Sequence, residues 1–251
     1  METEPMCEEC GCGESSSVKK NDNKHSMIVN RSVTEANDLL AQQNLDFLSE
    51  KKILSINLMG APGSGKTTFI EGICNYLKPA DVVVIQGDLE SDIDKRRLEA
   101  HKIQSYQINT HSGCHLTSAM INKALLDLDV SKKKYLIIEN VGNLVCPANV
   151  NIGQHLNIVV SSTVEGTDKP QKYPYIFMDA SLIVLSKYDL ADKTDFHEEQ
   201  YVRDLHHINA KAALLKTSSK DALSFKPAAD FLDHQRDHLF SIHHTHSRKK
   251  M

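Results

Sequence analysis

The sequence contains no tryptophan and has no excess of basic charge. Its formal net charge is −4, so its composition does not indicate a nucleic-acid partner. No stretch approaches the roughly 18 consecutive apolar residues of a membrane helix. The N-terminus is acidic and carries cysteines, which is the reverse of the basic and then apolar start of a secretory signal. We therefore expect a cytoplasmic protein that binds neither nucleic acid nor a membrane.

Six cysteines are present, and cytosolic thiols stay reduced. They are therefore better interpreted as metal ligands, catalytic groups or core residues than as disulfides. Three of them, Cys7, Cys10 and Cys12, lie within the hexapeptide CEECGC, where no apolar pattern would hold them in a core. Cys74 lies inside an apolar helical pattern, and we expect it in the core.

The chain divides into four expected regions. Residues 1–30 are polar and predict a flexible tail that carries the first three cysteines. Residues 31–50 predict a helix, which Ser32 or Thr34 could cap. Its expected apolar stripe consists of Ala36, Leu39, Leu40, Leu45 and Leu48. Residues 51–240 predict one α/β domain.

Residues 241–251 form the fourth region, a C-terminal tail with His243, His244 and His246. These histidines could bind a metal weakly. A frayed polar end is the alternative, and the sequence slightly favours it.

Strand and helix patterns alternate through the α/β region. Strands are expected at 53–60, 81–88, 102–109, 135–140, 156–163, 180–189 and 212–219. Helices are expected at 67–77, 90–101, 117–128, 196–209 and 224–240. This alternation predicts a mostly parallel sheet with helices on both faces. Polar residues follow the strands, at the edge where such sheets bind ligands.

A phosphate-binding motif, GAPGSGKTT, occupies Gly60–Thr68 between an expected strand and an expected helix. The match to G-x-x-x-x-G-K-[ST] in this context predicts a P-loop, with a chance glycine-rich turn as the alternative. The residues Gly60, Ala61, Pro62, Gly63, Ser64, Gly65, Lys66, Thr67 and Thr68 are expected to surround phosphates. Lys66 is expected to contact the β- and γ-phosphates, and Thr67 to offer its hydroxyl to Mg²⁺.

The tetrapeptide SKYD follows a later apolar strand, where nucleotide-switch proteins carry N-K-x-D. Asp189 can accept hydrogen bonds from both N1–H and N2–H₂ of guanine, a pair of donors that adenine lacks. The stem of Lys187 can lie against the base, and Ser218 in TSSK belongs to a second loop on the base side. Ser186 replaces the usual asparagine, which predicts weaker bracing of the loop. An ordinary strand-end turn is the alternative.

Further strand ends carry acids suited to Mg²⁺. Asp88 ends one apolar strand, and Glu139 ends another, in ENVGN. Gly142 lies where a glycine could sense the γ-phosphate. Asp94, between these two strands in the sequence, is a weaker candidate for binding Mg²⁺. A solvated strand-end acid is the alternative for each carboxylate.

A second metal set is formed by Cys114 and His115, before an expected helix, and by Cys146, after the Glu139 strand. Thiolate and imidazole suit zinc or nickel. One chain offers at most three ligands here, so a site shared across a two-fold dimer is attractive. On spacing alone, the plainer interpretation as buried cysteines and a loop histidine is favoured.

These motifs in this order resemble the HypB family of hydrogenase nickel-incorporation GTPases. The resemblance covers essentially the whole chain, and C-x-x-C-G-C is its most specific element. It implies a P-loop GTPase of the SIMIBI class that uses GTP, GDP and Mg²⁺. It assigns a tight nickel site to Cys7, Cys10 and Cys12. A nickel or zinc site at a dimer interface is implied for Cys114, His115 and Cys146.

The resemblance also implies GTP-dependent homodimers that deliver nickel, with a HypA-type chaperone, to the [NiFe]-hydrogenase large-subunit precursor. Hydrolysis is expected to be slow, because the sequence displays no obvious general base or arginine finger. A nickel storage protein is an alternative and would bind several ions regardless of GTP. A P-loop kinase would require ATP, against which SKYD argues. A urease-type nickel GTPase is a close relative to exclude, and the N-terminal thiols argue against it.

Overall fold

The computed structural model describes residues 23–88, 93–110 and 113–241. Within them, the chain forms a seven-stranded sheet in the order β3-β2-β4-β1-β5-β6-β7. The strands are β1 Leu54–Met59, β2 Val82–Asp88, β3 Gln104–Asn109, β4 Tyr135–Glu139, β5 Leu156–Ser162, β6 Leu182–Ser186 and β7 Ala213–Lys216. Every neighbouring pair is parallel. The predicted strands and their parallel arrangement are confirmed.

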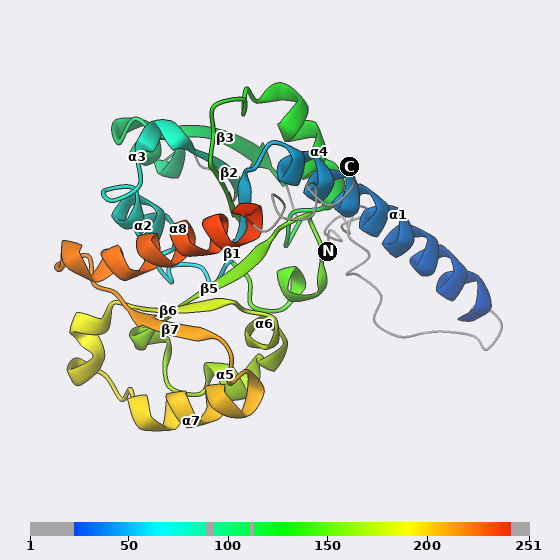
Figure 1. The fold of residues 1–251 in the computed structure, drawn as a ribbon. Coiled ribbons are helices and arrows are strands. Elements are labelled where there is room, and N and C mark those ends of the chain that lie inside the picture. The colour runs from blue at the N-terminus through cyan, green and yellow to red at the C-terminus, as the bar shows by residue number, and fades with distance from the viewer. Residues whose placement is uncertain (1–22, 89–92, 111–112, 242–251) are drawn as a thin grey trace, which may run out of the picture.

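Helices connect the strands and cover both faces of the sheet (Figure 1), because parallel neighbours require crossover connections. The helices are α1 Asn23–Glu50, α2 Lys66–Ile73, α3 Ile93–Ala100, α4 Ser118–Asp127, α5 Lys169–Lys172, α6 Pro174–Met178, α7 Glu198–Ile208 and α8 Lys226–Ser241. The short helices α5 and α6 were not predicted, since four and five residues are too few to show a helical period.

The core consists of apolar side chains on the two faces of the sheet. On one face, Phe69 and Ile70 of α2 pack with Leu232 of α8. On the other face, Leu48 of α1 and Ile121 of α4 pack over β2 and β4. Helices α6 and α7 cover β5 and β6 on the same side through a further cluster. Since β1 is buried along its whole length, its carboxyl end is a rigid base for the loop that follows.

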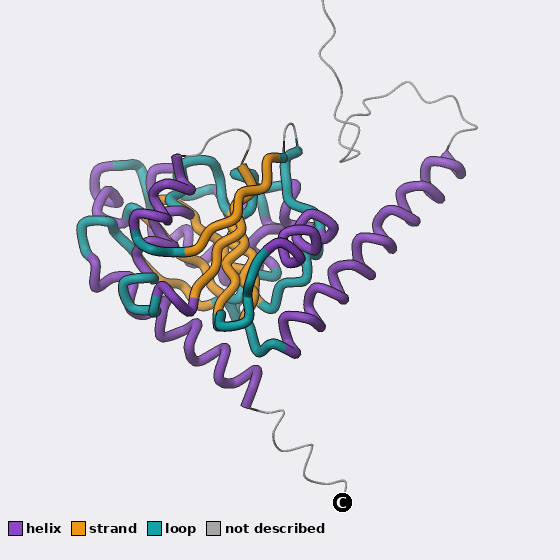
Figure 2. The backbone as a smooth tube through the Cα atoms, turned by 90° about the horizontal axis from the view of Figure 1, so that it is seen from above, coloured by secondary structure: helices purple, strands orange, loops and turns teal. Residues whose placement is uncertain are grey.

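Helix α1 differs from its prediction at the N-terminal end. It begins at Asn23 rather than near residue 31, so residues 23–30 are helical and neither Ser32 nor Thr34 is a cap. No proline or glycine interrupts residues 23–50, and extending an existing helix costs far less than nucleating one. Both views of the chain show this first part of α1 extending beyond the sheet (Figures 1 and 2).

The buried face of α1 also differs from the expected apolar stripe. Ala36 and Leu39 are exposed, whereas Asn44 is 1% exposed. Asn44 Nδ2 donates to the carbonyl oxygen of Ser118 at 2.9 Å, and Ser118 Oγ donates to Asn37 Oδ1 at 2.8 Å. Two asparagines therefore dock α1 on the start of α4. Within the described part of the chain, no helix is long and apolar enough to cross a membrane.

Candidate functional site

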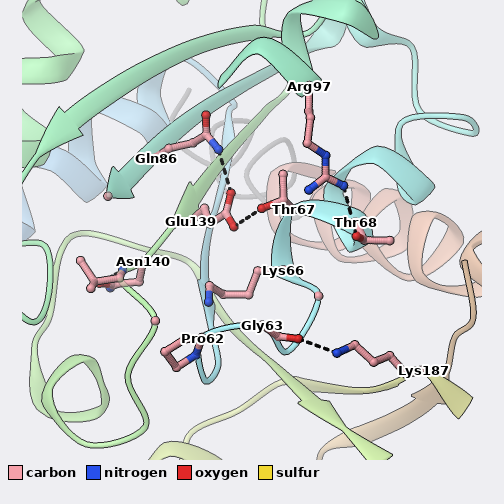
Figure 3. Close-up of a pocket in the computed structure, with 14 residues that line it drawn as sticks. Pro62, Gly63, Lys66, Thr67, Thr68, Gln86, Arg97, Glu139, Asn140 and Lys187 are labelled. Atoms are coloured by element: carbon pink, nitrogen blue, oxygen red, sulfur yellow. Dashed lines mark hydrogen bonds between the residues drawn. The ribbon is translucent and has the colours of Figure 1, made fainter. Parts of the chain in front are cut away.

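A cavity of about 440 Å³ opens at the carboxyl ends of β1, β2 and β4. Figure 3 shows the side chains that line it, which come from the P-loop, from β2, from α3 and from the segment after β4. This is the edge at which open parallel sheets bind ligands. The predicted residues Gly63, Gly65, Lys66, Thr67, Thr68, Glu139, Gly142 and Lys187 all line the cavity, together with Pro62.

The P-loop adopts the conformation that its glycines predict. Gly65 immediately precedes α2, and its φ of 99° lies in the left-handed region of backbone conformation, where a residue with a side chain would be strained. Lys66 is 8% exposed, and its Nζ donates to the carbonyl oxygens of Gly60 and Ala61, each at 3.2 Å. The backbone N–H groups at the start of α2, with the ammonium beside them, make a site for anions.

The Mg²⁺ candidates Thr67 and Glu139 are in direct contact. Thr67 Oγ1 donates to Glu139 Oε1 at 2.7 Å, and both side chains are buried. A third residue, Gln86, completes the group, because its Nε2 donates to Glu139 Oε2 at 3.0 Å (Figure 3). Gln86 is the register partner of Glu139 on the neighbouring strand. Sequence reasoning missed it, since an amide inside a strand carries no motif.

The remaining acidic candidates are placed by their backbone alone. Asp88 is the last residue of β2, two residues after Gln86 on the same strand. Asp94 lies in the first turn of α3. Their side chains lie outside the described residues, so their approach to Mg²⁺ remains a prediction.

Arg97 of α3 adds a positive charge to the cavity wall that sequence reasoning did not single out. Its Nε donates to Glu71 Oε1 at 3.0 Å, and its Nη2 donates to Glu71 Oε2 at 2.7 Å. Nη2 also donates to Thr68 Oγ1 at 3.3 Å. This bidentate pair holds a guanidinium against the first turn of the P-loop helix.

The SKYD segment lies beside the P-loop. Lys187 Nζ donates to the carbonyl oxygen of Gly63 at 2.8 Å, from a residue whose backbone is left-handed (φ 52°). Ser186 Oγ donates to the carbonyl oxygen of Ser64 at 2.5 Å. The hydroxyl of Ser186 thus reaches the P-loop directly, and weaker bracing than an asparagine would give stays a prediction.

Asp189 and Ser218 meet, as the two base-side loops predict. Ser218 Oγ donates to Asp189 Oδ1 at 2.7 Å, and Lys220 Nζ lies 3.1 Å from Asp189 Oδ2. The Ser218 hydrogen bond, with the Lys220 ammonium second, holds the pKa of Asp189 below its usual range. The carboxylate is therefore ionised at neutral pH and able to accept hydrogen bonds.

Cys114, His115 and Cys146 converge, as predicted. Their ligand atoms all lie within 4.8 Å of one another, and Cys114 Sγ lies 3.5 Å from His115 Nδ1. Burial lowers the pKa of His115, which favours the neutral imidazole that binds metals. Two sulfurs and one imidazole form a donor set that fits zinc or nickel. Among the described residues, no fourth histidine, cysteine or carboxylate joins this group.

The segment between Glu139 and Cys146 lies between the two sites. Asn140 Oδ1 accepts from the backbone N–H of Leu116, the residue after His115, at 3.0 Å. A Cβ on Gly142 would lie 2.9 Å from Pro62 Cα, so this segment packs tightly on the P-loop. Asn143 contacts both Gly60 and Cys146. Neither asparagine was singled out from the sequence.

Cys7, Cys10 and Cys12 lie outside the described residues, as do His243, His244 and His246. Cys74 is buried in the core as expected, and burial raises the pKa of its thiol to about 12.

Known proteins are similar to this chain in both fold and sequence. The family model of the CobW/HypB/UreG nucleotide-binding domain matches residues 54–216. A hydrogenase/urease maturation factor HypB from Helicobacter hepaticus is 40% identical over 226 residues, which is 88% of this chain and 93% of that protein.

Two solved structures extend the comparison. The crystal structure of HypB from Helicobacter pylori in complex with nickel superposes with a TM-score of 0.78 at 35% identity, covering 82% of this chain and 97% of that one. HypB from Archaeoglobus fulgidus gives a TM-score of 0.75 at 34% identity, covering 80% and 99%. The fold and site thus define a P-loop nucleotide-binding protein of the CobW/HypB/UreG group. Within that group, the chain belongs to the HypB family.

Proposed function

We propose that this protein is a GTP-hydrolysing nickel chaperone whose nucleotide state controls its affinity for metal. The observation that carries the proposal is the position of the Cys114, His115 and Cys146 donor set, which one short segment joins to a P-loop. A storage protein has no need for a metal centre that is linked to a phosphate site. Membership of the HypB family supports the same conclusion.

In the proposed reaction, water attacks the γ-phosphorus of GTP. A bond forms from the water oxygen to phosphorus, the bond from phosphorus to the β–γ bridging oxygen breaks, and GDP and phosphate leave as the water proton passes to the phosphate or solvent. Lys66 would stabilise the charge on the β- and γ-phosphates. Thr67, Asp88 and Glu139 would hold Mg²⁺, with Asp94 as a further candidate. No described side chain stands out as a base, so we expect slow turnover.

Guanine specificity would come from Asp189 and Lys187. The Asp189 carboxylate is held by Ser218 and Lys220, so its orientation is set before a base arrives. Preorganised acceptors lose little freedom on binding, which favours recognition of the N1–H and N2–H₂ donors.

Nickel is the proposed cargo, bound at two places. Cys7, Cys10 and Cys12 would form the tight site. The Cys114, His115 and Cys146 centre would hold nickel or zinc and respond to nucleotide. A HypB of known structure binds nickel, which supports this choice of metal.

The proposed partners are a second copy, a HypA-type nickel chaperone and the precursor of the [NiFe]-hydrogenase large subunit, all in the cytoplasm. Three exposed apolar side chains support an interface with a second copy: Val145 is 58%, Tyr175 is 64% and Met178 is 49% exposed. Val145 directly precedes the metal ligand Cys146, and the other two residues lie on α6. Helix α6 contacts the short 3₁₀ helix Cys146–Asn149. Urease is a second candidate recipient, because the Helicobacter relatives are named for both enzymes.

A nickel titration under chelator competition tests the proposal. The full chain is compared with Cys7/Cys10/Cys12→Ala and with Cys114→Ala, each with Mg²⁺ and with or without a non-hydrolysable GTP analogue. We expect the first variant to lose the tight site and keep a weaker, nucleotide-sensitive one, and the second to lose only the latter. Several nickel ions per chain and no response to GTP would instead indicate storage.

A further inference from the structure

We propose that the side chain of Asn143 is the coupling element that transmits the state of the P-loop to the metal ligand Cys146. This inference rests on the proposed function, because it presumes that the chain binds both a nucleotide and a metal. It assigns the coupling to one positioning residue that is proposed to bind neither the nucleotide nor the metal itself.

On the nucleotide side, Asn143 is bonded to the first residue of the P-loop. Its backbone N–H donates to the carbonyl oxygen of Gly60 at 3.2 Å, and the two residues form an isolated antiparallel bridge. The same oxygen accepts from Lys66 Nζ at 3.2 Å. When Lys66 turns to the β- and γ-phosphates, this shared carbonyl loses a donor, so the Gly60–Asn143 bond responds directly to nucleotide.

On the metal side, one amide group determines the position of Cys146. Asn143 Oδ1 accepts from the N–H of Val145 at 2.7 Å and from the N–H of Cys146 at 3.2 Å. Asn143 Nδ2 lies 3.5 Å from Cys146 Sγ, toward which it donates. An asparagine can make all three contacts because its side chain carries both an acceptor and donors.

The other two metal ligands are anchored differently. Asn140 holds the N–H of Leu116 at 3.0 Å, and Asn140 Nδ2 donates to Asn57 Oδ1 on β1 at 3.0 Å. Cys114 and His115 are thus tied to the sheet, whereas Cys146 is tied to the P-loop. A movement of the P-loop therefore changes the separation of Cys146 from the other two ligands. Metal–ligand distances tolerate only about 0.2 Å, so a small movement alters affinity.

The test measures coupling rather than turnover. Every arm uses the full chain with Cys7, Cys10 and Cys12 replaced by alanine, so that only the inner site reports. The affinity for Ni²⁺ is measured by chelator competition with and without a non-hydrolysable GTP analogue and Mg²⁺. The affinity for the analogue is measured with and without Ni²⁺, since the two ratios must agree.

Asn143→Ala removes the three side-chain contacts and keeps the backbone bridge. Asn143→Asp keeps the acceptor oxygen, and its added charge acts equally with and without nucleotide. Asn149→Ala is the matched control, because Asn149 is exposed on the same loop. Asn143→Leu preserves the volume and replaces the alanine variant if the latter does not fold.

We expect a shift of at least about fivefold in the parent and in Asn149→Ala, and a similar one in Asn143→Asp. In Asn143→Ala the shift falls below about twofold, while the analogue affinity without Ni²⁺ stays within about twofold of the parent. A full shift in Asn143→Ala, or equal losses in the alanine and aspartate variants, would overturn the assignment. A parent that binds both ligands without any shift would refute the coupling itself. A parent that binds no analogue would refute the proposed function.

Discussion

Thr67 and Glu139 are joined by a hydrogen bond of 2.7 Å between Thr67 Oγ1 and Glu139 Oε1, from the first turn of α2 to the end of β4. The two residues are far apart in the chain, and the order β4-β1 brings them together at one sheet edge. The carboxylate has its second oxygen held by Gln86. This arrangement fixes the direction in which both oxygens face the cavity, and it supports a Mg²⁺ site.

The first prediction concerns Glu139→Gln, which keeps the shape of the side chain and removes its charge. We expect GTP turnover to fall by at least about 100-fold, because Mg²⁺ would be held less tightly and would stabilise less of the negative charge on the transferred phosphate. Turnover is measured at increasing Mg²⁺ concentration, and binding of a GTP analogue is measured without Mg²⁺. Analogue binding without Mg²⁺ serves as the folding control and is expected to persist. Unchanged turnover at low Mg²⁺ would contradict the role of Glu139.

The second prediction concerns Gln86→Met, which removes the donor to Glu139 at nearly equal volume. Groups that orient a metal ligand typically contribute about tenfold to a hundredfold in affinity, and we expect a loss of about tenfold for Mg²⁺. Gln104→Met, on the neighbouring strand β3, is the matched control. Mg²⁺ titration of single-turnover hydrolysis compares the two. Equal effects of both substitutions would show that Gln86 acts through packing alone.

Local patterns were sufficient to predict the P-loop and the seven strands, whereas the metal set of Cys114, His115 and Cys146 was expected from the family resemblance, because spacing alone favoured the plainer interpretation. Cys114, His115 and Cys146 follow strands of one parallel sheet, so their approach follows from the rule that such strands end at a common edge. The P-loop can be predicted from its own glycines and from the helix that follows it. These features depend on short stretches of sequence, which explains why they could be predicted.

The residues that sequence reasoning missed act through neighbours that only the fold supplies. Gln86 matters because β2 pairs with β4 in the register that places it opposite Glu139. Asn140 and Asn143 have no spacing signature, since an amide can bond to any nearby backbone group. The start of α1 was misplaced because polar residues near a helix end do not reveal whether the helix continues through them.

The third prediction concerns Asp189→Asn and the recognition of guanine. The change removes one acceptor and the charge, so we expect GTP affinity to fall about tenfold to a hundredfold. The asparagine amide can donate to the C2 carbonyl of xanthine, so xanthosine triphosphate should bind more tightly than it does to the parent. Competition binding of the two nucleotides measures both effects. Unchanged preference for GTP would show that another group reads the base.

The fourth prediction concerns His155, which joins α1 to β1. The N–H of Ser55 donates to His155 Nδ1 at 3.1 Å, and Ser49 Oγ lies 2.9 Å from His155 Nε2. Because Nδ1 accepts, the neutral ring carries its proton on Nε2 and donates to Ser49. A second proton would meet the Ser55 N–H, and burial lowers the pKa of His155 to about 4.

The unfolded chain protonates this histidine near pH 6.5, whereas the folded chain resists protonation until about pH 4. The contribution of His155 to the free energy of unfolding is therefore complete above about pH 6.5 and is lost as the pH falls toward about 4, by about 3 kcal/mol in total. Urea unfolding at several pH values in this window measures how the free energy of unfolding changes with pH.

His155→Asn retains an acceptor for Ser55 but does not titrate, so its stability should vary less with pH than that of the parent. His206→Asn, at an exposed position of α7, is the matched histidine-to-asparagine control. If the stability of His155→Asn changed with pH as much as that of the parent, the acid sensitivity of the fold would have to arise from another group.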